Sequence, residues 1–136
     1  MRFRATRLHD VKVIELEPTR DGRGSFTRTF CAREMAAAGL ETAFVQASFS
    51  HTDRAGTVRG MHFQRAPHEE VKVIRCIAGA IYDVLIDVRP ASPTYMQWEA
   101  YELAAGDARQ LYVPKGFAHG FQTLAPATEV AYTMTA

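Results

Sequence analysis

The stretch that decides the fold is Val-Lys-Val-Ile-Arg-Cys-Ile-Ala-Gly-Ala-Ile-Tyr-Asp-Val-Leu-Ile-Asp-Val, residues 71–88. Two β-rich runs on either side of Ala78-Gly79 predict a β-hairpin. With the turn at 78–79, Lys72 lies opposite Leu85 and diagonal to Asp83 on one largely apolar face. A lysine on such a face needs a partner, so we expect Asp83 to support Lys72 in an ion pair.

Outward from this stretch, the pattern of short β-rich runs and turn residues continues along the chain. Further strands are predicted at 11–16, 43–49, 57–64, 96–103, 109–113, 117–124 and 128–134, and 26–30 is expected to be a short strand or an extended segment. One helix is predicted over 31–38, which is rich in helix-forming residues, with Gly39 in the C-terminal cap position. About eight to ten short strands with a single helix indicate an all-β sandwich or barrel. We expect one domain over residues 1–136.

Composition excludes several classes of protein. The 136 residues carry a formal net charge of +1, so no general field attracts nucleic acid or an anionic membrane. The apolar runs are too short to cross a bilayer, and no apolar stretch follows the basic N-terminus, so we expect neither a membrane segment nor a secretory signal. The two cysteines, Cys31 and Cys76, have no metal or redox spacing. Free thiols in the cytoplasm are the expected state.

Residues 57–64, Thr-Val-Arg-Gly-Met-His-Phe-Gln, combine the groups that an anion-binding and proton-transferring site needs. Arg59 is always charged, and His62 titrates near neutral pH. Gly60 allows close approach of the backbone. In a strand over 61–64, His62 and Gln64 share one face.

The sequence contains residues for three kinds of chemistry: nucleophilic catalysis, metal catalysis and proton transfer without a metal. Nucleophilic catalysis is disfavoured, because no serine has a Gly-x-Ser-x-Gly context and Cys76 lies in an apolar strand. A metal cupin would use His62, Glu69 or Glu70, and His119, but Gln64 stands where that pattern has a second histidine. Amides are poor ligands for transition metals, so we expect no metal.

Proton transfer without a metal needs a base, a cation beside the developing oxyanion and an acid on the opposite face. His62, Lys72 and Tyr132 have the right chemistry for these three roles. Each of them alone is more often structural, and composition does not place them together.

Several motifs, taken together, resemble one family. They are Asp-Gly-Arg-Gly-Ser-Phe at 21–26, Phe-Val-Gln at 44–46, Val-Arg-Gly-Met-His-Phe-Gln at 58–64, the run 79–89, Ser-Pro-Thr at 92–94, Arg-Gln-Leu-Tyr-Val-Pro at 109–114, Gly-Phe-Ala-His-Gly-Phe at 116–121 and Glu-Val-Ala-Tyr at 129–132. They occur in the order found in the dTDP-4-dehydrorhamnose 3,5-epimerases and cover nearly the whole chain.

The resemblance implies a double-stranded β-helix, the jelly roll of the cupin type, in a homodimer that uses no cofactor. It implies a dTDP-linked 4-keto-6-deoxyhexose as substrate, in deoxysugar biosynthesis of the rhamnose type. The catalytic base of the family corresponds to His62 and the acid on the opposite face to Tyr132. Lys72 corresponds to the residue that steadies the enolate oxygen.

The resemblance also implies a set of substrate-binding residues. Arg59 and Arg23 match positions that hold the diphosphate, and Arg23 would reach across from the partner subunit. Gln46 and His119 match further substrate-binding positions. Phe26, Arg28 and Ser48 belong to the same set of positions.

The chain departs from the family at three points. Arg28 replaces the usual glutamate, which reverses a charge on the nucleotide side, and Ser48 replaces the usual asparagine. Most members also continue past residue 136 with a segment that carries an aromatic on thymine and an aspartate that orients the catalytic histidine. We take the shortness as natural, so epimerisation at a single carbon is one expectation. A non-catalytic cupin that binds a sugar nucleotide, or a degenerate paralogue with a structural role, is the alternative.

Overall fold

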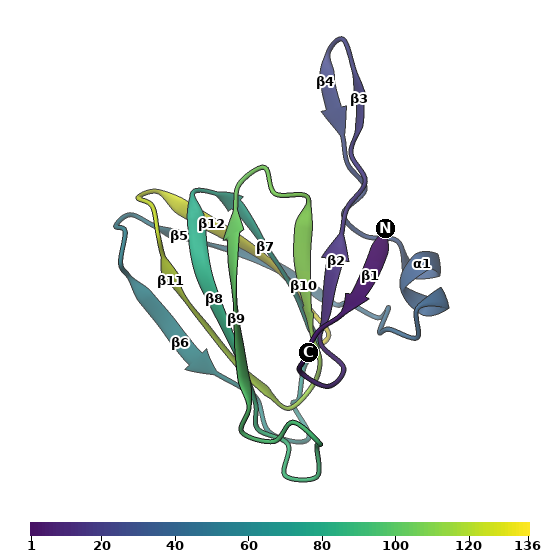
Figure 1. Ribbon diagram of the computed structural model, residues 1–136, viewed down its shortest axis with the longest axis vertical. Helices are drawn as coiled ribbons and strands as arrows, with labels where there is room; N and C mark the ends of the chain where they lie inside the picture. Colours follow the sequence, from purple (N-terminus) through teal and green to yellow (C-terminus); the bar gives the residue numbers. More distant parts are fainter.

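The computed structural model describes residues 1–136 and contains twelve β-strands and one short helix (Figure 1). The strands are β1 (Arg2–Ala5), β2 (Lys12–Glu15), β3 (Thr19–Asp21), β4 (Gly24–Phe26), β5 (Gln46–Thr52), β6 (Val58–His62), β7 (Lys72–Ala78), β8 (Ala80–Asp87), β9 (Trp98–Ala104), β10 (Arg109–Val113), β11 (Phe117–Thr123) and β12 (Thr128–Met134). Helix α1 spans Ala32–Ala37. The expected all-β class is confirmed.

Two sheets form the body of the molecule. The six-stranded sheet has the order β1-β2-β10-β7-β12-β5, and the four-stranded sheet has the order β6-β11-β8-β9. All the pairings are antiparallel, and most neighbours in each sheet are distant in sequence, as in a jelly roll. The remaining pair, β3 and β4, is a hairpin that projects away from the sandwich (Figure 1).

The main core lies between the two sheets. Ile74, Leu111 and Val130 come from the six-stranded sheet and are fully buried. They belong to the same cluster as Leu85 and Phe121 from the four-stranded sheet. Strand alternation sends the neighbouring side chains to the outer face of the six-stranded sheet. There a second, smaller cluster, which includes Met35 of α1, packs against the sheet.

The hairpin predicted over residues 71–88 is wrong. β7 pairs with β10 and β12, whereas β8 pairs with β9 and β11, so the two runs lie in different sheets. Lys72 is in register with Val113 and Met134, and it does not lie beside Asp83. The chain crosses between the sheets at Gly79, whose φ is +71° and whose missing Cβ would collide with Thr128.

The error has a physical cause. A hairpin and a crossing between facing sheets require the same alternation, because both place the apolar residues of the two strands on a common core. Ile74 and Leu85 do share that core, as the pattern required, but they face each other from opposite sheets. The sequence predicted which side chains are buried and gave no information on which strand pairs with which.

Most of the other elements follow the predicted ones closely, but 26–30 is not a strand, since only Phe26 belongs to β4. Strands β10 and β12 have the predicted bounds, and α1 lies within 31–38 with Gly39 at a φ of +70° after it. Strand β5 begins three residues later than predicted, since 46 replaces 43. Strand β1 was not predicted, because its alternating arginines at the sheet edge lack an apolar pattern.

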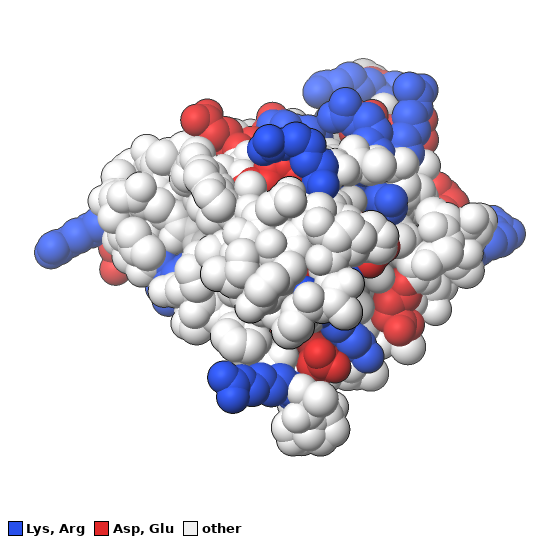
Figure 2. Space-filling model, turned by 60° about the horizontal axis from the view of Figure 1, so that its bottom comes forward, with Lys and Arg blue, Asp and Glu red and all other residues white.

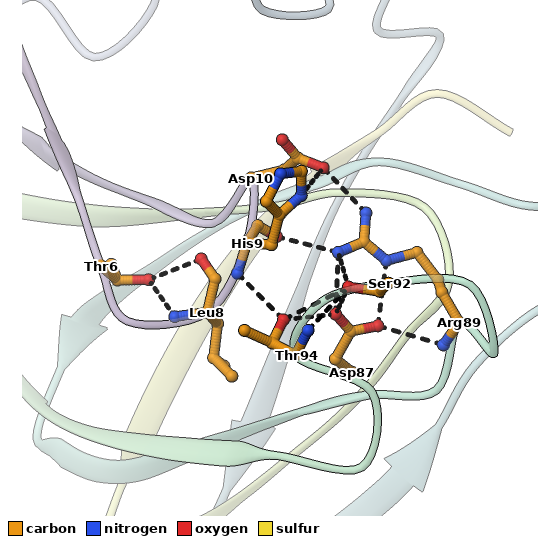
Figure 3. Close-up of polar contacts among 8 residues, drawn as sticks. All are labelled: Thr6, Leu8, His9, Asp10, Asp87, Arg89, Ser92 and Thr94. Carbon is orange, nitrogen blue, oxygen red and sulfur yellow. Dashed lines mark hydrogen bonds and ion pairs between the residues drawn. The ribbon is translucent and has the colours of Figure 1, made fainter.

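A polar cluster joins the loop between β1 and β2 to the loop between β8 and β9 (Figure 3). At its centre is Asp87, which is fully buried. Asp87 accepts hydrogen bonds from Arg89, Ser92 and Thr94, and Arg89 also pairs with Asp10 at 2.9 Å. These contacts fix two loops that have no ladder between them.

Charged side chains of both signs lie on the surface, and the helix content is low. Figure 2 shows the lower end with charges of both signs scattered around a largely uncharged area, and Lys and Arg gathered at its upper right margin. The one helix is six residues long, and no helix has the length and apolar character needed to cross a membrane.

Candidate active site

A cleft of about 460 Å³ opens beside the main core, at the ends of strands from both sheets. Five of the lining side chains are polar groups singled out in the sequence: Arg59, His62, Lys72, His119 and Tyr132. They come from β6, β7, β11 and β12, which are far apart in the chain. The volume lies within the range of about 300–1,000 Å³ that is usual for small-ligand pockets.

Two glycines allow β6 and β11 to approach closely. Gly60 has a φ of +122°, and a Cβ there would lie 2.6 Å from the Cα of Gly120. The ladder is irregular between His119 and Phe121, and His119 is the direct partner of His62 in it. The close approach therefore places two imidazoles on neighbouring strands of the same cleft.

Arg59 is oriented by strand β5. Its Nε donates to Thr52 Oγ1 at 2.9 Å, and one Nη donates to the carbonyl of His51 at 3.0 Å. Both acceptors are neutral, so the guanidinium is held in place and keeps its whole positive charge. The remaining N–H donors are free to bind an anion, for which the planar fork of arginine is well suited.

Tyr132 is half-buried, and its hydroxyl lies 3.2 Å from Ser50 Oγ. Burial raises the pKa of the phenol, and the charge of Asp83 acts in the same direction. The Ser50 hydrogen bond and the charge of Arg59 oppose this rise and do not cancel it. The phenol therefore keeps its proton at neutral pH, as a proton donor must.

Asp83 lies beneath the cleft and contacts His119. Its Oδ1 is 2.7 Å from His119 Nε2, the side chain is fully buried, and Oδ2 has no hydrogen-bond partner. Burial raises the pKa of Asp83, and His119 only partly opposes that rise. The ion pair expected between Asp83 and Lys72 is wrong, because the two strands belong to different sheets.

Lys72 pairs instead with Glu70, Nζ to Oε1, at 2.9 Å. The two side chains are only 14% and 11% exposed. Glu70 lies just before β7, two residues from Lys72, and strand alternation gives the two residues the same face. Lys72 on the inner face therefore does have a carboxylate partner, and that partner is only two residues away in the sequence.

The donors that a metal cupin needs are not assembled. No group of three or more His, Cys, Asp and Glu side chains lies close enough to bind one ion. Glu70 faces Lys72, and one ring nitrogen of His119 faces Asp83. β6 ends at His62, so Gln64 is not held on the same strand face.

Comparison with known proteins identifies the family. The family model for dTDP-4-dehydrorhamnose 3,5-epimerase matches residues 5–136. The chain belongs to the dTDP-4-dehydrorhamnose 3,5-epimerase family. A relative of that name from Sinorhizobium fredii (strain NBRC 101917 / NGR234) is 40% identical over 136 residues, which are 100% of this chain and 70% of the relative.

Solved structures of the epimerase family have the same fold. The Bacillus anthracis str. Ames enzyme, solved with TDP and PPi bound, matches with a TM-score of 0.94 at 44% identity, over 98% of this chain and 77% of that one. The Legionella pneumophila Philadelphia 1 enzyme, solved with dTDP-4-keto-L-rhamnose, matches with a TM-score of 0.91 at 36% identity, over 98% and 71%. The jelly roll expected from the resemblance to this family is confirmed.

Three of the substrate-binding residues predicted from the epimerase resemblance lie outside the cleft. Arg23 is at the tip of the projecting hairpin, 92% exposed, and pairs with Asp21. Phe26, on the same hairpin, is 76% exposed. Arg28 pairs with Glu34 of α1 at 2.9 Å, so the charge reversed relative to the family is balanced within the chain.

Two further residues predicted from the family lie on β5. Gln46 and Ser48 are in register with Met134 and Tyr132, so they lie on the same face as the catalytic candidate Tyr132. Both are exposed, and neither lines the cleft. The β5 residue that does contact the Tyr132 hydroxyl is Ser50.

The residues that sequence reasoning missed are the supporting ones: Ser50, Thr52 and Glu70. Ser50 and Glu70 were detectable only as residues two positions from a predicted one, beside strands whose bounds had to be known. Ser50 follows Ser48 at the strand period, and Glu70 precedes Lys72 at the same period. Thr52 carried no signal, because its partner Arg59 is on another strand.

Proposed function

We propose that this protein epimerises a dTDP-linked 4-keto-6-deoxyhexose by removing a proton beside the keto group and returning one to the opposite face. The observation that carries the proposal is the cleft itself, which gathers an imidazole, an ammonium and a protonated phenol in one space. The ligands named for relatives, dTDP-4-keto-L-rhamnose among them, support this class of substrate.

The proposed chemistry uses three residues of this chain. The 4-keto group acidifies the hydrogens at C3 and C5, and His62 removes one of them as the general base. The Lys72 ammonium stabilises the enolate oxygen that forms. Tyr132, whose pKa is raised chiefly by burial, returns a proton from the other face.

Substrate binding is assigned to the charged end of the cleft. Arg59 would hold the diphosphate, since its guanidinium is fixed by two neutral acceptors and its other donors remain free. His119 lines the same cleft and would contact the sugar nucleotide. Gln46 and Ser48 would act at the open edge of the same face.

We also propose a homodimer in which the β3–β4 hairpin of one subunit enters the site of the other, bringing Arg23 to the diphosphate and Phe26 and Arg28 to the nucleotide side. The hairpin projects away from the two main sheets and pairs with neither of them (Figure 1). The outer face of the six-stranded sheet, which a second copy would cover, exposes Phe49 and Ile77 at 67% and 42%. Sedimentation equilibrium that finds only a monomer at micromolar concentration would exclude this assembly.

The cytoplasm is the proposed compartment. Both cysteines, Cys31 and Cys76, are free thiols, which suits a reducing environment. Fractionation of the source cells with an antibody tests this, and recovery of the protein outside the cytoplasm would contradict it.

The deciding experiment is exchange of solvent deuterium into dTDP-4-keto-6-deoxyglucose, followed separately at C3 and C5 by NMR. Wild type should incorporate deuterium at one or both carbons, and His62→Ala should lose nearly all exchange. Tyr132→Phe should exchange without completing the inversion. His68→Ala is the matched control, because His68 is exposed and outside the cleft.

The alternative, a cupin that only binds the nucleotide, has no support in the comparisons. It predicts calorimetric binding of dTDP without any exchange. Equal deuterium incorporation by wild type and His62→Ala would refute the assignment of the base. Exchange at C3 alone or C5 alone would establish the single-carbon reaction.

A further inference from the structure

The Lys72–Glu70 ion pair has no part in the mechanism described above. Glu70 makes its only ion pair with Lys72, at 2.9 Å, and its side chain is slightly more buried than that of the lysine. Lys72 lines the cleft and Glu70 does not. The carboxylate therefore pairs with the ammonium without itself lining the cleft.

This placement matters because lysine is a flexible residue. Its ammonium sits on a four-carbon stem and has three donors without a preferred direction. A lysine that stabilises an oxyanion must hold its ammonium within hydrogen-bond reach of one oxygen. Glu70 pairs with the ammonium of Lys72 at 2.9 Å from a position two residues earlier in the chain, which restricts where the ammonium can lie.

We propose that Glu70 is the positioning residue for Lys72. This inference rests on the proposed function, in which Lys72 faces the enolate oxygen. The essential feature is the acceptor oxygen of Glu70, which fixes the place of the ammonium. The negative charge of Glu70 is not needed for this, and it reduces the positive charge that Lys72 offers to the enolate.

Two substitutions separate the oxygen from the charge. Glu70→Gln keeps an acceptor oxygen in the same place and removes the charge, so exchange at the reacting carbon should equal or exceed that of wild type. Glu70→Ala removes the acceptor, and exchange should fall about 10- to 100-fold, the usual effect of displacing a catalytic group by about 1 Å. The dTDP affinity should not change in either variant.

A double variant tests whether Glu70 acts through Lys72. Lys72→Ala should lose activity by itself, and adding Glu70→Ala should cause no further loss, because residues that act as a unit are not additive. Glu69→Ala is the matched control, since Glu69 is the adjacent carboxylate and has no ion pair. Thermal unfolding of every variant shows whether it is folded at the assay temperature.

A second readout does not depend on activity. The chain has three lysines, Lys12, Lys72 and Lys115, so the 13Cε signals of labelled lysine are readily assigned. The Lys72 signal should stand apart in wild type and Glu70→Gln, and move toward the other two in Glu70→Ala. If wild type shows no exchange, the proposed function fails while this measurement still decides the placement of Lys72.

Three results would overturn the proposal. Glu70→Ala could exchange as fast as wild type while folded. Glu70→Ala could lower exchange by the same factor in the Lys72→Ala variant as in wild type, which would mean that Glu70 does not act through Lys72. Glu70→Gln could lose as much as Glu70→Ala, which would make the charge, not the oxygen, the essential feature.

Discussion

His119→Ala should destabilise the protein in a way that depends on pH. The substitution removes the only hydrogen-bond partner of Asp83, a fully buried carboxyl that already has one unpaired oxygen. Breaking a buried pair by removing one partner costs about 3–5 kcal/mol. That is a large part of the roughly 5–15 kcal/mol by which a domain is stable.

The direction of the pH effect follows from the pKa of Asp83. Burial raises it above its unfolded value of about 4, and removing His119 takes away the group that opposes this rise. When the pKa of an acid is higher in the folded state than in the unfolded state, folding takes up a proton at pH values above the unfolded pKa. The stability of the folded state therefore falls as the pH rises.

Urea unfolding at pH 4.5 and pH 7.5 measures the effect. His119→Ala should lose less stability relative to wild type at the lower pH than at the higher pH, because uptake of a proton by Asp83 relieves the cost of its buried charge. The double variant His119→Ala/Asp83→Asn has no carboxyl there, so its deficit should be nearly the same at both pH values. An equal loss by His119→Ala at both pH values would refute the reasoning, because Asp83 would not be the titrating group.

Two further substitutions test the close approach of β6 and β11 and the loop cluster. Gly60→Ala should lower stability by more than the roughly 1–3 kcal/mol of backbone strain alone, since its Cβ would also meet Gly120; thermal unfolding measures this, with Gly22→Ala, which meets nothing, as the control. Although burial raises the pKa of Asp87, hydrogen bonds from Arg89 and its neighbours outweigh this and hold that pKa well below its usual range. Asp87→Asn should therefore lower the free energy of unfolding by about 3–5 kcal/mol at neutral pH, as measured with denaturant. Wild type should lose stability as the pH falls below about 4, and Asp87→Asn should lose less over the same range. An equal loss in the two proteins over that range would contradict this.

The sequence predicted the elements of the fold much better than their pairing. Strands such as β10 and β12 have local signals, namely alternating side chains bounded by proline, glycine or a turn. Pairing across a sandwich has no local signal, and the run 71–88 satisfies a hairpin and a crossing equally well. Recognition of the family gave the jelly roll, but the register of Lys72 and Asp83 was inferred from the hairpin and was wrong.

The candidate site divides in the same way. His62, Lys72 and Tyr132 were found because their chemistry fits the reaction and because family motifs surround them. Their partners were not found, since each depends on register: Ser50 reaches Tyr132 from a neighbouring strand, and Asp83 reaches His119 across the ladder of β8 and β11. Side-chain chemistry is visible in a sequence, whereas what orients each side chain depends on the packing of the sheets.

The partners of the three basic side chains suggest how the cleft separates binding from catalysis. Arg59 is held by neutral oxygens only, so its charge is fully available to a permanent anion such as a diphosphate. Lys72 and His119 each face a buried or nearly buried carboxylate, Glu70 and Asp83. In the proposed mechanism, the carboxylate of Glu70 balances the charge of Lys72 before the reaction begins, so this part of the cleft presents little net charge to an uncharged ketose. A negative charge that develops on the keto oxygen would then meet an ammonium already in place, which would stabilise the enolate more than the ground state.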